Sequence, residues 1–141
     1  MERNTLDSIF KLAHAVKQHF HHMLETEQLG IAPMHMRALK IIEKKRDCTA
    51  NDIAQFTKRD KAQITRLLAG LIEQGIIEKQ PNPKDKRSQL LVITEQGQKI
   101  QAQLARQGQN AYLKMTEGLS EAEISQFETI AEKMARNIGR L

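Results

Sequence analysis

Apolar residues recur at three- and four-residue spacing along residues 5–28, which is the period of an amphipathic helix. The stripe consists of Leu6, Ile9, Phe10, Ala13, Val16, Phe20, Met23 and Leu24. Asn4 is a plausible N-cap for this helix, and Gly30 is a plausible stop signal after it. A second helix is predicted from Pro33, which suits a first helical position, to about Lys45.

The next stretch predicts two helices separated by a brief turn. Thr49 begins a capping arrangement for a short helix over residues 50–56. Asp60 can cap a longer helix over residues 61–74, and Gly75 suits the position just beyond its end. The side chains predicted to face inward on that helix are Ile64, Leu67, Leu68, Leu71 and Ile72. This arrangement predicts a helix-turn-helix.

Residues 76–80 and 89–93 are rich in Ile, Leu and Val and flank a loop that contains two prolines, which predicts a β-hairpin. Thr94 can cap a long helix over about residues 95–116. The side chains predicted to face inward on it are Ile100, Leu104, Ala111 and Met115. A final helix begins at the capping box of Ser120. The expected fold is mainly α with a small β-hairpin, a winged helix-turn-helix carrying a helical lobe.

Positive charge collects on the helix-turn-helix and the hairpin. The whole chain has a net charge of +5. Between residues 56 and 88 there are eight basic and four acidic residues, whereas residues 101–141 carry five of each. Such a distribution favours a polyanion partner, although a solvated charged surface explains it about as well. The motifs therefore have to decide between the two.

The first turns of the 61–74 helix carry polar side chains suited to reading DNA. Gln pairs with adenine, Lys and Arg pair with guanine, and the methyl group of Thr contacts the thymine methyl. The residues concerned are Lys61, Gln63, Thr65 and Arg66. The hairpin loop 81–88 adds Lys84, Lys86 and Arg87, and a basic protruding loop suits a narrow minor groove. Asp85 is expected to orient or neutralise a nearby arginine, because phosphate repels a carboxylate.

Several segments together resemble the MarR family of bacterial winged-helix regulators, and the most specific is an Asp-x-Arg wing followed by Thr-x-x-Gly. The matching segments are Ile31-Ala32-Pro33 with His35 and Leu39, Thr49 to Ala54, Asp60-Lys61, Ile64-Thr65-Arg66-Leu67, Leu71 to Gly75, Asp85-Lys86-Arg87 and Thr94-Glu95-Gln96-Gly97. The resemblance departs at Ala62 and Gln63, where Ser and Thr are common. It departs also at Ala32, where a capping Thr is usual.

The resemblance implies that residues 1–30 and 98–141 join two copies into a homodimer, while residues 31–97 bind DNA. The implied partner is a pseudo-palindromic operator, read by helix 61–74 in the major groove and by the wing in the minor groove. Repression is the usual outcome, and activation stays open because the position of the operator relative to the promoter decides it. Release by a small ligand is common in the family.

An effector pocket, if present, is expected to draw on His14, Met34, His35, Arg37 and Tyr112. For each of these residues a packing or surface role is favoured over ligand binding. The histidines lack a Cys or carboxylate at ligand-like spacing, so we expect neither a metal site nor a cofactor. Cys48, the only cysteine, is expected to be a buried structural thiol rather than a redox switch.

Two other classes of function compete with this interpretation. A winged-helix module that binds protein rather than specific DNA is the alternative. An enzyme is disfavoured, because no nucleophile–base–acid set, phosphate-cradling glycine loop or metal motif occurs. The chain has no apolar run near the ~20 residues of a membrane span and no signal-peptide pattern. Together with the resemblance, which implies a bacterial DNA-binding protein, this predicts a cytoplasmic location and association with the nucleoid when bound to DNA.

Overall fold

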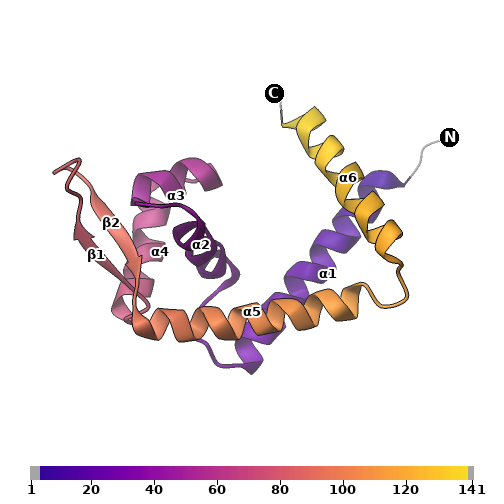
Figure 1. Cartoon of the computed structure of the whole chain (residues 1–141), viewed down its shortest axis with the longest axis horizontal. Coiled ribbons are helices and arrows are strands. Elements are labelled where there is room, and N and C mark those ends of the chain that lie inside the picture. The colour runs from indigo at the N-terminus through magenta and orange to yellow at the C-terminus, as the bar shows by residue number, and fades with distance from the viewer. Residues whose placement is uncertain (1–3, 140–141) are drawn as a thin grey trace. The chain divides into compact units, whose positions relative to one another are not determined.

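The computed structural model describes residues 4–139, which form six helices and one two-stranded antiparallel sheet (Figure 1). The elements in chain order are α1 (Thr5–Thr26), α2 (Pro33–Lys44), α3 (Ala50–Thr57), α4 (Lys61–Glu73), β1 (Ile77–Pro81), β2 (Gln89–Ile93), α5 (Glu95–Met115) and α6 (Glu121–Ile138). The predicted fold class and order of elements are confirmed. No helix in the described part of the chain is long and apolar enough to cross a membrane.

The chain divides into two compact units, Met1–Gln107 and Gly108–Leu141, and α5 crosses the boundary between them. The division predicted from the sequence, in which residues 1–30 and 98–141 form a dimerisation lobe and residues 31–97 bind DNA, stays a prediction. The first unit holds the hydrophobic core, which α1, α2, α3, α4 and the hairpin all enclose. Its largest fully buried side chains are Leu39, Ile53, Ile64, Leu68, Leu71, Ile76, Ile77 and Cys48.

Several helices begin and end at the capping residues and glycines that the sequence predicts. The Thr49 hydroxyl accepts a hydrogen bond from the N–H of Asp52, whose carboxylate accepts one from the N–H of Thr49 in return. Gly75 has φ +73° after α4, and the N–H of Ile76 reaches back to the carbonyl of Leu71 at 3.0 Å. This is the Schellman arrangement, in which the residue beyond the glycine closes the helix.

The predicted end of α1 is wrong by two residues, and its stop signal was misassigned. The helix ends at Thr26, and Gln28 rather than Gly30 takes the left-handed position beyond the cap, with φ +53°. The N–H of Leu29 then bonds to the carbonyl of Leu24 at 3.3 Å. Asn4 does occupy the N-cap position, but its side chain makes no capping hydrogen bond.

Much of the apolar pattern on the long helices is not buried within the chain. The last turns of α1 are buried through Met23 and Leu24, whereas Phe10 near its start is 66% exposed. Met115, predicted to face inward on α5, is 52% exposed, which corrects that prediction. In α6 no described residue is buried. The large apolar side chains exposed on α6 are Phe127, Ile130, Met134 and Ile138.

Candidate nucleic-acid interface

The polar face of α4 lies open to solvent at the helix N-terminus. Asp60 caps the helix by accepting a hydrogen bond from the N–H of Ala62 at 3.3 Å. The opposite face anchors the helix through Ile64, Leu68 and Leu71, which are buried. The four residues predicted to contact DNA, Lys61, Gln63, Thr65 and Arg66, are all exposed. The helix therefore presents these side chains from a fixed backbone.

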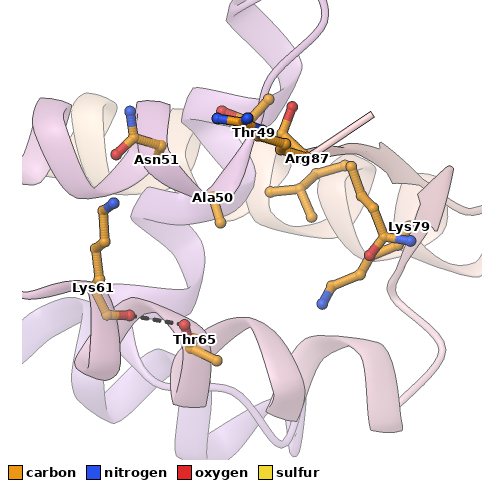
Figure 2. Close-up of a pocket in the computed structure, with 10 residues that line it drawn as sticks. Thr49, Ala50, Asn51, Lys61, Thr65, Lys79 and Arg87 are labelled. Carbon is orange, nitrogen blue, oxygen red and sulfur yellow. Dashed lines mark hydrogen bonds between the residues drawn. The ribbon is translucent and has the colours of Figure 1, made fainter. Parts of the chain in front are cut away.

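The hydroxyl of Thr65 is directed back onto its own helix. It donates a hydrogen bond to the carbonyl of Lys61 at 2.8 Å, as the dashed line in Figure 2 shows. This bond holds the side chain in one rotamer and uses its only donor. The methyl group and the acceptor lone pairs of the hydroxyl stay unused, and the methyl group suits contact with an apolar group such as the thymine methyl.

The tip of the hairpin is held by two short side chains that bond to the backbone. Asn82 accepts a hydrogen bond from the N–H of Lys84 at 3.0 Å and donates one to the hydroxyl of Ser88 at 3.0 Å. Asp85 accepts one from the N–H of Arg87 at 2.9 Å and one from the hydroxyl of Ser88 at 3.4 Å. These bonds give the exposed loop a defined shape, as Asn and Asp side chains do in turns.

Asp85 therefore acts on Arg87 through the backbone. The ion pairs found among residues 4–139 are His21 with Glu25 and Lys40 with Glu43, and neither involves Asp85. The prediction that this carboxylate neutralises an arginine side chain is therefore wrong. The carboxylate does lie beside Arg87, as expected, but it binds the backbone of that residue. The side chains of Lys84, Lys86 and Arg87 remain exposed.

A hollow of about 310 Å³ lies between the N-terminus of α3, the outer face of α4 and the hairpin. Figure 2 shows Lys61 and Thr65 from α4 opposite Lys79 and Arg87 from the hairpin. The polar residues that line the hollow are Thr49, Asn51, Lys61, Thr65, Lys79, Arg87, Ser88 and Gln89. Three cations and no carboxylate border it, so its chemistry suits an anion.

The hollow brings together three residues that the sequence selected, Lys61, Thr65 and Arg87. The other four predicted DNA contacts, Gln63, Arg66, Lys84 and Lys86, are exposed but do not line it. Lys79 and Asn51 were missed. Lys79 pairs across the hairpin with the buried Leu91, and paired residues lie on the same face of a sheet, so alternation along the strands was the available signal for Lys79.

A backbone hydrogen bond ties the hairpin to the start of α3. The N–H of Leu91 donates to the carbonyl of Cys48 at 2.8 Å, directly before the Thr49 cap. The side chain of Cys48 is buried, and burial raises the pKa of its thiol to about 11. Asp52 raises that pKa further while Lys45 opposes the shift. The residue thus lies where the two halves of the site join, as a protonated thiol.

The suggested effector residues are spread over both units. His14 and Arg37 are exposed, Met34 and His35 are half-buried, and Tyr112 belongs to the second unit, where it is exposed. The Nδ1 atom of His35 is already engaged, because it accepts a hydrogen bond from the N–H of Ala32 at 2.9 Å. Within the described residues no group of three His, Cys, Asp or Glu side chains is placed to hold a metal ion.

The segment that carries this interface is similar in sequence to known proteins. Residues 29–88 match the sequence model of the MarR family. The chain is 39% identical over 59 residues to the HTH-type transcriptional regulator BilQ of Clostridioides difficile, covering 42% of this chain and 40% of that protein. It is 32% identical over 87 residues to the multiple antibiotic resistance protein MarR of Salmonella typhimurium, covering 61% and 60%. The matched stretches thus span less than two thirds of either relative.

The fold extends the likeness beyond those stretches. A MarR protein from Peptoclostridium difficile superimposes with a TM-score of 0.82 at 20% identity, covering 98% of this chain and 89% of that one. Residues 29–88 thus match the MarR family in sequence, and the chain shares the winged helix-turn-helix fold of a solved MarR protein.

Proposed function

We propose that this protein is a transcriptional regulator that binds a pseudo-palindromic DNA operator as a homodimer. One observation carries the proposal. Cations from the start of α4 and from the hairpin, Lys61, Lys79 and Arg87, border one open hollow on the same face. Phosphate oxygens supply the matching charge, and the exposed side chains of α4 supply groups that read base edges.

The two parts of the interface have different roles in this proposal. The exposed N-terminal side of α4 enters the major groove, where Gln63, Thr65 and Arg66 meet the bases. The wing follows the backbone, and Arg87 reaches the minor groove with Lys84 and Lys86 beside it. Lys79 and Asn51, at the rim of the hollow, join the phosphate contacts.

A second copy of the chain is the partner that we assign to the uncovered apolar faces. The first half of α1 exposes Leu6, Ile9 and Phe10, and α6 exposes a row of large apolar side chains. Such faces are costly in water and usually mark a contact between proteins. Two copies would present two α4 helices, so a two-fold axis in the protein calls for one in the DNA.

Repression with release by a small ligand is the finer part of the proposal. A dimer on an operator that overlaps a promoter excludes the polymerase, and a ligand that changes the distance between the two α4 helices releases the DNA. Both relatives described above are named as regulators or resistance proteins rather than as enzymes. We assign no catalytic role to the residues of the site.

Selection from a pool of random DNA duplexes tests the proposal with the full-length protein. We expect a palindrome whose half-sites lie about one helical turn apart, bound in the range of about 10⁻⁸ to 10⁻¹¹ M. Affinity should fall steeply with salt, since each phosphate contact releases counterions. Recovery of no shared sequence, or binding that salt does not change, would contradict the proposal and favour a module that binds protein.

Single substitutions then locate the interface on the selected duplex. Arg87→Ala and Lys79→Ala should each weaken binding and reduce the slope against salt by about 1. Lys133→Ala, on α6, removes an exposed cation that does not line the hollow and is the matched control. Equal losses in all three variants would show that net charge, and not this face, binds the DNA.

A further inference from the structure

The first turn of α2 is closed by a histidine in place of the usual hydroxyl cap. Ala32, at the N-cap position, has no side-chain acceptor. Instead the Nδ1 atom of His35 accepts a hydrogen bond from the N–H of Ala32 at 2.9 Å, and the N–H of His35 donates to the carbonyl of Ala32 at 2.9 Å. The chain thus replaces one half of a capping box with an imidazole.

This hydrogen bond exists only while the imidazole is neutral. Nδ1 accepts through a lone pair that a proton removes, because both ring nitrogens are donors in the charged form. A positive charge is also unfavourable at a helix N-terminus, where the backbone dipoles already point their positive ends. Burial lowers the pKa of His35 from its ordinary value of 6.5. Hydrogen bond, dipole and burial all favour the same neutral state.

The other nitrogen of the ring faces the recognition helix. A Cβ placed on Gly70 of α4 would lie 3.5 Å from Nε2 of His35, so the ring packs over the one residue of α4 that lacks a side chain. The ring therefore spans from the start of α2 to α4. Any movement of the ring at the start of α2 would therefore occur against the helix that we assign to the major groove.

The charged groups around the ring do not hold a proton on it. On α4, Arg66 and Glu73 lie about one turn to either side of Gly70 and carry opposite charges. On α2 the nearest charge is the exposed Arg37. At the end of α1, Glu27 accepts hydrogen bonds from two glutamine amides of α5. Among residues 4–139, none of these side chains forms an ion pair with His35.

We propose that His35 is a pH-responsive latch, whose protonation opens the first turn of α2, loosens its packing on α4 and weakens DNA binding in mildly acidic conditions. This inference rests on the proposed function. The sign follows from linkage. The stabilisation is present above the ordinary histidine pKa of 6.5, and it is lost as the pH falls through the lower pKa of the folded protein.

Three proteins test the latch: the wild type, His35→Gln and His22→Gln. Gln at this position keeps an acceptor for the N–H of Ala32 that does not titrate. His22 is exposed on α1, so its replacement controls for removing a histidine in general. Thermal unfolding and affinity for the selected duplex are measured at about pH 7.5 and about pH 5, the second well below the usual histidine pKa because burial lowers the pKa of His35.

On acidification, the unfolding midpoint of the wild type and of His22→Gln should fall by about 4 °C more than that of His35→Gln. Their DNA affinity should fall about fivefold, the effect of one typical cap, while His35→Gln keeps or gains affinity as other histidines become positive. The same pH dependence in His35→Gln as in the wild type would overturn the latch. The expected unfolding result with no DNA binding at either pH would support the latch at α2 and contradict the proposed function.

Discussion

Gly97, in the first turn of α5, lies against the backbone that precedes the wing. A Cβ built there would meet the carbonyl oxygen of Ile76 at 2.1 Å and the Cγ2 atom of Ile93 at 2.7 Å. The Thr94 hydroxyl occupies the same junction, where it accepts a hydrogen bond from the N–H of Gly97 and donates to the carbonyl of Gly75 or Ile76. Only glycine fits, which gives the Thr-x-x-Gly motif its physical reason.

Gly97→Ala should therefore destabilise the fold by about 2–3 kcal/mol, because the added methyl group meets backbone that cannot move aside. Urea unfolding at fixed protein concentration measures the loss. Gly108→Ala is the matched control in the same helix, since nothing lies within 4 Å of its Cβ position. It should be neutral or stabilising by about 0.5–1 kcal/mol, and a loss equal to that of Gly97→Ala would contradict the explanation.

Cys48 should be unreactive while the chain is folded. Its thiol is 1% exposed, and burial raises its pKa to about 11. A thiol reagent at neutral pH should label it only in denaturant. Because the folded pKa lies above the ordinary 9.0, the associated stability is present below pH 9.0 and is lost as the pH rises through about 11. Rapid labelling of the native protein would contradict this prediction, because it would show that the packing around Cys48 opens to solvent.

At the scale of the element, the Asp85 carboxylate helps to shape the tip of the wing by accepting a hydrogen bond from the N–H of Arg87. Asp85→Asn keeps an oxygen for the N–H of Arg87 and removes the charge, whereas Asp85→Ala removes both. We expect DNA affinity to be retained or improved in the first variant and weakened in the second by about 1 kcal/mol, the value of one lost hydrogen bond. Titration of the selected duplex measures both. Equal loss of DNA affinity in the two variants would show that the charge of Asp85, and not its hydrogen bond, is its main contribution.

Local chemistry defines the elements well because it acts over only a few residues. The Thr49 cap, the Asp60 cap and the turn at Gly75 are each complete within four or five residues, and each lies where the sequence places it. Gln28 is the instructive exception. Gln28 takes the left-handed conformation that ends α1, although Gly30, a residue better suited to it, lies only two positions further on. The burial of Met23 and Leu24 decides where the helix must turn.

At the scale of the whole molecule, the second unit leaves most of its large apolar side chains exposed instead of burying them in a core of its own. No described side chain of α6 is buried, and Ile138 is 69% exposed. A stable contact between two proteins buries about 1,200–2,000 Å² in total. Residues such as those on α6 supply the apolar centre that a contact of this size needs.

Replacing Phe127 and Ile130 together by Ser should convert the proposed dimer to a monomer in sedimentation experiments. DNA affinity should fall by at least about a hundredfold, because one α4 helix reads only half of a palindrome. Glu128→Gln, an exposed change on the same helix, should leave both properties unchanged. A double variant that stays dimeric would place the interface elsewhere.

The sequence by itself determined the kinds of element, their order, most of their ends and the two basic segments. These depend on spacing and on caps that lie within one turn. Only the tertiary structure decided that Lys61 and Arg87 border one hollow with Lys79, that Asp85 acts through the backbone, and that His35 caps α2 over Gly70. Such pairings join residues far apart in the chain, and the packing of a shared core, which no local period encodes, sets their distances.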